Sequence, residues 1–384
     1  MQNKSSPENQ NTIMRFLLLT FLFSFLFSFS QNIVLGENSK ISLLTCGKGE
    51  ELYTTFGHTA IRITDQQNQL DVVFNYGQFD FREGNFYLKF VKGNLQYQIG
   101  VASFEDFIAE YQYDRRQVVE QILNFSTSQK QELLDALVAS KFSPSENHYT
   151  YKFIDRNCTT MVVDKLNLVL KKPLIFKTDN KSISYREVLY PKFENYFWYK
   201  LGINIIFGTK VDEKAEQLFL PYELENSLDK LKVNGKKLVA KKQILVVSNQ
   251  PQHQFSFFDS IYFISLLLAI LLVLNKKIST NIYLFVSGCL GLFLVLVGLY
   301  SLHKELLWNY NALLFNPLFV FLPFIRNTNT LKKIGILSLL LLLFYFIFML
   351  NKSHLFLMIP FIIAHFVILF KISKLQKHLG IRKM

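Results

Sequence analysis

Cysteine is scarce in this sequence, which has only Cys46, Cys158 and Cys289 in 384 residues. Three thiols cannot form the dense disulfide framework that stabilises many small exported domains. The sequence also lacks internal repeats and, apart from a Phe-rich leader, low-complexity tracts. Neither a disulfide scaffold nor a repeat architecture is therefore expected.

Apolar residues, by contrast, make up 50% of the chain and include 39 Phe, and the mean hydropathy is +0.19. A single soluble domain rarely has this composition, so a membrane protein is expected. The net charge of +13 by itself suggests a nucleic-acid partner. The basic residues cluster at the ends of apolar runs, however, so we expect the bilayer and no nucleic acid as the partner.

The N-terminus has the features of an export signal. Lys4 and Arg15 precede the apolar stretch FLLLTFLFSFLFSFSQ, and Ser28 and Ser30 occupy the −3 and −1 positions of a cut before Gln31. Residues 1–30 are therefore predicted to be a signal peptide or, if uncut, an anchor.

An all-α transmembrane domain with a basic tail is predicted over 257–384, with about five helices near 257–274, 281–302, 311–325, 334–350 and 355–370. If the first span starts outside, the outer loops hold only two basic residues, Lys304 and Lys352. The inner loops and tail then hold ten basic residues: Lys276, Lys277, Arg326, Lys332, Lys333, Lys371, Lys374, Lys377, Arg382 and Lys383. This asymmetry predicts a multi-pass protein of the inner (cytoplasmic) membrane whose tail is inside.

Residues 31–247 are long enough for a separate exported α+β domain, joined to the bundle by a linker at 248–256. Alternation and β-branched or aromatic content predict strands at 58–64, 71–77, 95–101, 117–123 and 149–154. Helices are predicted over 103–113, where Ser103 and Asp106 resemble a capping box, and over 128–142, opened by Ser128. A third helix is expected to start near Cys158.

Cys158 has three interpretations: a small buried hydrophobe, half of a disulfide with Cys46, or a nucleophile. Its context, DRNCTTMVVDKL, places it at a helix N-terminus, where unpaired N–H groups and the macrodipole favour a thiolate and an oxyanion. His58, in YTTFGHTAIRI, is the candidate base, although a lone histidine is more often structural. Cys289 lies within an apolar span, where packing is its expected role.

Several ordered motifs resemble one known family. LLTCGKGEELYTTFGHTAIRIT, VVFNYGQFDF, NFYLKFVKGNLQYQIG, YTYKFIDRNCTT, ISYREVL and WYKLGINIIFGTKVD are similar to the exported domain of Lnb-type lipoprotein N-acyltransferases of Gram-negative bacteria. HKELLWNYNALLFNPL resembles part of the membrane domain of that family. The resemblance covers nearly the whole chain.

The resemblance implies a circularly permuted papain-like domain, similar to the NlpC/P60 and lecithin:retinol acyltransferase (LRAT) groups, in which the histidine strand precedes the cysteine helix. Cys158 matches the family nucleophile and His58 its general base. Asn75 is the candidate for the residue that orients the imidazole, with Asp71 as a weaker one. Asn157 and Thr159 flank the thiol and are expected to bind substrate or to cap the helix.

The same resemblance implies the reaction and its partners. An acyl chain would pass from a membrane phospholipid, through a Cys158 thioester, to the α-amine of an apolipoprotein's diacylglyceryl-cysteine, in the periplasm. No cofactor is implied, and no metal, because His58 and Cys158 lack the paired spacing of zinc ligands. In the outer loop, His303, Trp308, Asn309 and Asn311 are candidates to line the lipid path, with interfacial anchoring as the alternative.

Two other functions remain open from the sequence. The Cys158 and His58 pair is also compatible with a membrane-tethered cell-wall cysteine peptidase or amidase, and the whole chain with a non-catalytic membrane assembly factor.

Overall fold

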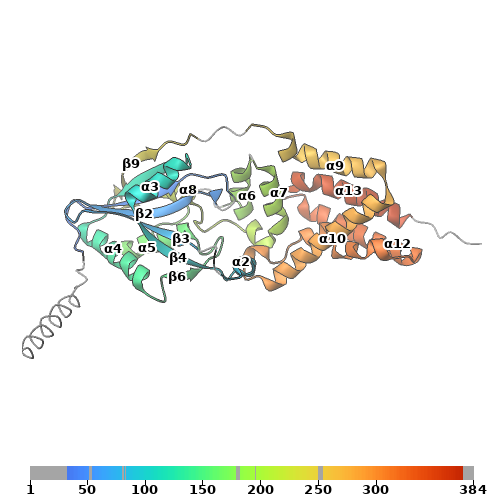
Figure 1. The fold of residues 1–384 in the computed structure, drawn as a ribbon, viewed down its shortest axis with the longest axis horizontal. Helices are drawn as coiled ribbons and strands as arrows, with labels where there is room; N and C mark the ends of the chain where they lie inside the picture. The colour runs from blue at the N-terminus through green and yellow to red at the C-terminus, as the bar shows by residue number, and fades with distance from the viewer. Residues whose placement is uncertain are drawn as a thin grey trace, which may run out of the picture.

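A computed structural model describes residues 33–374 except 52–53, 80–81, 83, 179–181, 195 and 250–253. The chain forms a sheet-rich N-terminal part and a helical C-terminal part, which lie end to end (Figure 1). The predicted signal at 1–30 lies outside the described residues, as do much of the linker and Lys377, Arg382 and Lys383 of the tail.

The N-terminal part is built on an antiparallel sheet of seven strands in the order β6-β4-β3-β2-β1-β5-β9. The strands are β1 (Lys40–Cys46), β2 (His58–Asp65), β3 (Leu70–Gln78), β4 (Gln96–Ser103), β5 (Val118–Leu123), β6 (His148–Thr150) and β9 (Val239–Val246). All five predicted strands are present, although β6 is shorter than expected. A separate ribbon pairs β7 (Lys232–Val233) with β8 (Lys236–Lys237).

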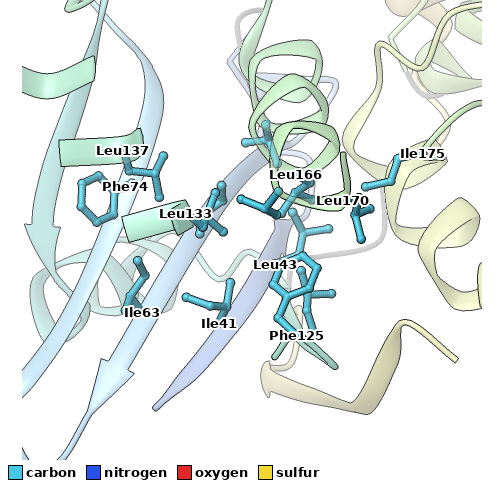
Figure 2. Close-up of a cluster of buried hydrophobic side chains, with 14 of the residues drawn as sticks. Ile41, Leu43, Ile63, Phe74, Phe125, Leu133, Leu137, Leu166, Leu170 and Ile175 are labelled. Atoms are coloured by element: carbon cyan, nitrogen blue, oxygen red, sulfur yellow. The ribbon is translucent and has the colours of Figure 1, made fainter. Parts of the chain in front are cut away.

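Helices cover both faces of this sheet. α4 (Thr127–Phe142), α5 (Cys158–Leu170) and α8 (Pro221–Lys230) pack on one face, where their leucines meet Ile41, Leu43 and Ile63 of the strands (Figure 2). α3 (Phe104–Tyr113) covers a smaller core on the opposite face. Ser103 caps α3 by accepting from the Asp106 N–H, as predicted, whereas Ser126 rather than Ser128 caps α4.

The C-terminal part contains three helices long and apolar enough to cross a membrane: α10 (Lys277–Tyr300), α12 (Thr328–Met349) and α13 (Leu355–Ser373). A fourth apolar helix, α9 (Ile261–Leu274), has 14 residues. At about 1.5 Å per residue it is shorter than a hydrocarbon core of about 30 Å. On α13, buried His365 faces another helix, with its Nε2 3.0 Å from the Tyr283 hydroxyl on α10.

The predicted helix over 311–325 is wrong. The chain there forms α11 (Asn311–Leu314) and the 3-10 turns η6 (Pro317–Val320) and η7 (Leu322–Phe324), because Asn316 caps η6 and the prolines cannot continue an α-helical ladder. This broken segment runs antiparallel to α10. Gly298 lies against Leu306, Gly291 against Phe315 and Gly288 against Val320.

The bundle has one basic end. Lys371 donates to Asn275 (Nζ to Oδ1, 2.9 Å), and Gly335 lies against Ile372, so the end of α9, the start of α12 and the end of α13 meet there. Seven of the ten basic residues in the predicted inner loops lie in described segments, and all seven belong to this end. The sheet-rich part docks on the opposite end of the bundle (Figure 1).

Helices α6 (Tyr185–Leu189) and α7 (Phe197–Ile206) and the turn η3 (Thr209–Asp212) join the two parts. Buried Arg186 donates to Asp212 (Nε to Oδ1, 2.7 Å), whose second oxygen accepts from the Tyr310 hydroxyl at 2.8 Å. Val297 and Leu306 of the C-terminal part share a buried cluster with Ile154 and Phe219 of the N-terminal part. The two parts therefore meet through both packed and polar contacts.

Candidate active site

Cys158 is the first residue of α5, at the end of the sheet where β2 begins. Asn157 fixes this helix start: its Oδ1 accepts from the N–H groups of Thr159 (2.9 Å) and Thr160 (3.1 Å), while its Nδ2 donates to Phe153 and Phe219 carbonyls. Asn157 is therefore a capping residue, as one of the two sequence interpretations held. The half-buried Cys158 side chain lies beside the positive end of the helix.

His58 begins β2, and its imidazole lies close enough to the Cys158 thiol for the charges of the two groups to interact. Its Nε2 donates to the Asn75 Oδ1, so Nδ1 is the ring nitrogen that remains for the thiol. Asn75 lies on β3, opposite Ala60, so pairing of β2 with β3 brings it diagonally beside His58. The three side chains form a Cys, His and Asn array drawn from two neighbouring strands and one helix.

The weaker candidate, Asp71, has a different role. It pairs with Thr64 near the other end of β3, and both of its carboxylate oxygens accept from Arg62, at 2.8 and 2.7 Å. The structure therefore places Asp71 in an ion pair away from the imidazole.

The charges of Cys158 and His58 stabilise each other. Burial raises the pKa of the Cys158 thiol, but the charge and hydrogen bond of His58 and the Thr59 N–H lower it, and the net pKa falls below 9.0. Burial lowers the pKa of His58, but the charge and hydrogen bond of Cys158 and the bond to Asn75 raise it, and the net pKa exceeds 6.5. Both shifts favour a thiolate and imidazolium pair, which is the reactive form of a cysteine nucleophile.

Cys46 lies opposite His58 in the pairing of β1 with β2, but the environment of its thiol differs from that of Cys158. Both thiols are free, so no disulfide joins them. Burial dominates at Cys46 and raises its pKa to about 12. Cys46 is therefore a protonated, packed thiol, and Cys158 is the accessible one of the two.

Gly77 opens the front of this site, a feature that sequence reasoning missed. Its φ of +110° suits glycine, and a Cβ there would lie 3.5 Å from the His58 Cε1 and 3.8 Å from the Cys158 Cβ. A longer side chain at this position would fill the space over the thiol. Thr159 lies behind the site, fully buried, with its hydroxyl 3.3 Å from that of Thr59.

The outer-loop candidates lie at the junction with the bundle. The Asn309 and Asn311 amides donate to backbone carbonyls of α7, at 2.8–2.9 Å, and the His303 Nε2 donates to the Phe90 carbonyl at 3.0 Å. Trp308 is 83% exposed. These contacts give the two asparagines a structural role, and lipid contact by the loop stays a prediction.

The same loop also contacts the segment that precedes Cys158. Lys152 donates to the Leu302 carbonyl (3.1 Å), the Ile154 N–H donates to the Glu305 Oε1 (3.1 Å), and Lys304 pairs with Asp155 (2.9 Å). Glu305 is almost completely buried. The bundle therefore supports the loop that carries Cys158.

Residues 28–189 match the family model of the Lnb N-terminal periplasmic domain, and this range contains Cys158, His58 and Asn75. The chain therefore carries a domain of the Lnb family. It is therefore a membrane protein with a periplasmic domain. Comparison with curated proteins and with solved structures gives no match. The Lnb match ends with α6, so α7, η3 and the bundle lie beyond it.

Proposed function

We propose that this Lnb-family protein is a lipoprotein N-acyltransferase. The observation that carries the proposal is the His58 imidazole held between Asn75 and Cys158, in a periplasmic domain docked on an apolar bundle. We also propose that the domain is circularly permuted papain-like, because its histidine strand precedes its cysteine helix. A reaction that uses lipid both as donor and in the acceptor explains why the two parts are joined.

In the first half-reaction, the Cys158 thiolate attacks an ester carbonyl of a membrane phospholipid. The Cys158 N–H at the start of α5 is placed to donate to the resulting oxyanion. The intermediate collapses with cleavage of the carbon–oxygen ester bond, and His58 gives its proton to the departing alkoxide. The products are a lysophospholipid and a Cys158 thioester.

In the second half-reaction, the α-amine of a lipoprotein's diacylglyceryl-cysteine attacks the thioester carbonyl. His58 takes a proton from the amine, the carbon–sulfur bond breaks, and Cys158 leaves as the thiolate. An amide forms and the enzyme returns to its starting state. Asn75 holds the imidazole in one orientation throughout both halves.

We further propose that the chain crosses the inner membrane five times: through α9, α10, the broken segment, α12 and α13. Irregular backbone is tolerated at membrane depth where protein buries it, and α10 covers the broken segment. With the domain in the periplasm, the basic end of the bundle then faces the cytoplasm.

The mass of lipoproteins in a strain that lacks this protein tests the activity. Their N-terminal cysteine should lose the amide-linked chain and regain it with the wild type or Cys46→Ala, but not with Cys158→Ala or His58→Ala. Identical masses in all strains, with no other N-acyltransferase present, would refute the proposal. Rescue by Cys158→Ala would instead indicate an assembly factor, and cleavage of a muropeptide by the full chain would indicate a peptidase or amidase.

A further inference from the structure

Helix α2 (Phe86–Lys92) connects the catalytic sheet to the outer end of α10. Its Val91 and Lys92 carbonyls accept from the Ser301 hydroxyl and the Leu302 N–H, both at 2.7 Å. Because α10 ends at Tyr300, these bonds fix α2 at the level where the apolar helix ends.

Helix α2 exposes apolar side chains and carries lysines. Leu88 is 64% exposed and Phe90 47% exposed, and Lys89 and Lys92 lie in the last turn. The adjoining end of α10 exposes further apolar side chains: Leu299, Tyr300 and Leu302. Exposed apolar residues with flanking lysines are typical of a helix that lies in a lipid interface.

Phe86, at the start of α2, leads toward the active site. The Phe86 ring lies 5.8 Å from that of Phe79, which stacks on Tyr97 at 4.9 Å, and Tyr97 stacks on Tyr151 at 4.4 Å. Gly77, two residues before Phe79, is the glycine that opens the space over Cys158. The described parts of the stretch 77–97 therefore reach the thiol at Gly77, the end of α10 at Lys92 and the aromatic stack at Tyr97.

We propose that α2 lies in the phospholipid surface around the outer end of α10 and guides a lipid acyl chain along Phe86, Phe79 and Tyr97 to Cys158. The phospholipid leaflet fits this surface for two reasons. The exposed apolar side chains of α2 continue the exposed apolar end of α10, and Lys92 in its last turn complements lipid phosphates. The position of α2 stands on these contacts, whereas the acyl path rests on the proposed function.

An environment-sensitive dye tests the position of α2 without any assay of activity. The dye is attached to Leu88→Cys in a full chain that also carries Cys158→Ala and Cys289→Ser, while buried Cys46 stays unlabelled. Phe142→Cys, on α4 far from the bundle and 79% exposed, is the matched control. In phospholipid nanodiscs, the dye at 88 should shift to the blue and be quenched by chain-labelled lipids. Equal spectra and quenching at 88 and 142 would overturn the proposal.

Acyl transfer from phospholipid in nanodiscs tests the path. Leu88→Glu and Phe90→Glu should each slow transfer about tenfold, because a carboxylate there opposes insertion. Phe142→Glu should leave transfer unchanged, and the rate of Cys158 alkylation should match the wild type in all three variants. Normal transfer by both α2 variants would refute the path while leaving the acyltransferase proposal intact. If the wild type itself transfers no acyl chain, the proposed function fails, and with it the path, and the dye result alone decides the position of α2.

Discussion

Glu305 should control activity from the bundle, although no described contact joins it to His58 or Cys158. Its carboxylate accepts from the N–H of Ile154, a fully buried residue four positions before Cys158. Glu305→Ala leaves that N–H buried without this acceptor, at a cost of about 1–3 kcal/mol. If the loop moves to recover this free energy, kcat/KM for acyl transfer should fall by roughly 5- to 150-fold.

Two neighbouring substitutions calibrate this effect. Glu305→Gln keeps an oxygen that can accept from Ile154, so it should lose much less activity than Glu305→Ala. Lys304→Ala breaks the ion pair with Asp155, in which the two side chains are 64% and 33% exposed. Such a pair contributes at most about 1 kcal/mol, so activity should fall less than about fivefold.

Thiol alkylation separates a positioning effect from general unfolding. In Glu305→Ala, the pH at which Cys158 becomes reactive should rise, because a displaced loop carries the thiol away from His58. The melting temperature need not fall in proportion to the activity. The second oxygen of Glu305 is a buried acceptor without a hydrogen bond among the described residues, so Glu305→Ala also removes an unsatisfied buried group. Wild-type kcat/KM and an unchanged alkylation profile in Glu305→Ala would refute the reasoning. Equal losses of kcat/KM in Glu305→Ala and Glu305→Gln would instead assign the effect to the charge of Glu305.

Three further results are expected. Activity should follow a bell-shaped pH profile, because the thiolate is lost as pH falls through the lowered pKa of Cys158 and the imidazolium is lost as pH rises through the raised pKa of His58. A flat profile of activity against pH would contradict this prediction. In His58→Ala, the pH midpoint of Cys158 alkylation should rise above 9.0, because burial then acts on the thiol without the opposing charge of His58. Cys46 should resist alkylation at neutral pH in the folded chain, because its pKa is about 12, and rapid labelling there would show that the assigned burial is wrong. Gly291→Ala should destabilise the bundle, because its Cβ would overlap the Phe315 carbonyl, whereas Gly202→Ala meets open space and should not lower the melting temperature of the purified protein.

Alternation, together with β-branched or aromatic content, was enough to predict five strands from the sequence, whereas β1 and β9 were missed. β2 and β3 keep enough alternation to reveal their positions. β1 is buried on both faces from Ile41 to Cys46, so its residues show no period of two. β9 is an edge strand whose exposed lysines obscure the pattern. The broken segment is apolar enough to suggest a helix, and only its Asn and Pro residues mark the breaks.

The candidate site was predictable where local chemistry defines it. Asn157 before Cys158 marks a helix start, and the strand that follows His58 supplies Asn75. The contact between Glu305 and Ile154 spans 151 residues, and no local pattern encodes it. Gly77 and Tyr97 were missed for a similar reason, because their proximity to the thiol depends on how β3 and β4 pair beside α5.

The junction also determines how the peptidase alternative can be tested fairly. A domain cut from the chain near residue 247 would lose Glu305, the acceptor for the N–H of Ile154, four residues before Cys158. It would also lose Tyr310, the donor to Asp212 in the network around buried Arg186. Inactivity of that fragment toward a muropeptide would therefore have two explanations: the wrong substrate or a displaced loop. Only the full chain in a bilayer keeps the loop in place, so its failure to cleave a muropeptide while it acylates lipoproteins separates the two chemistries.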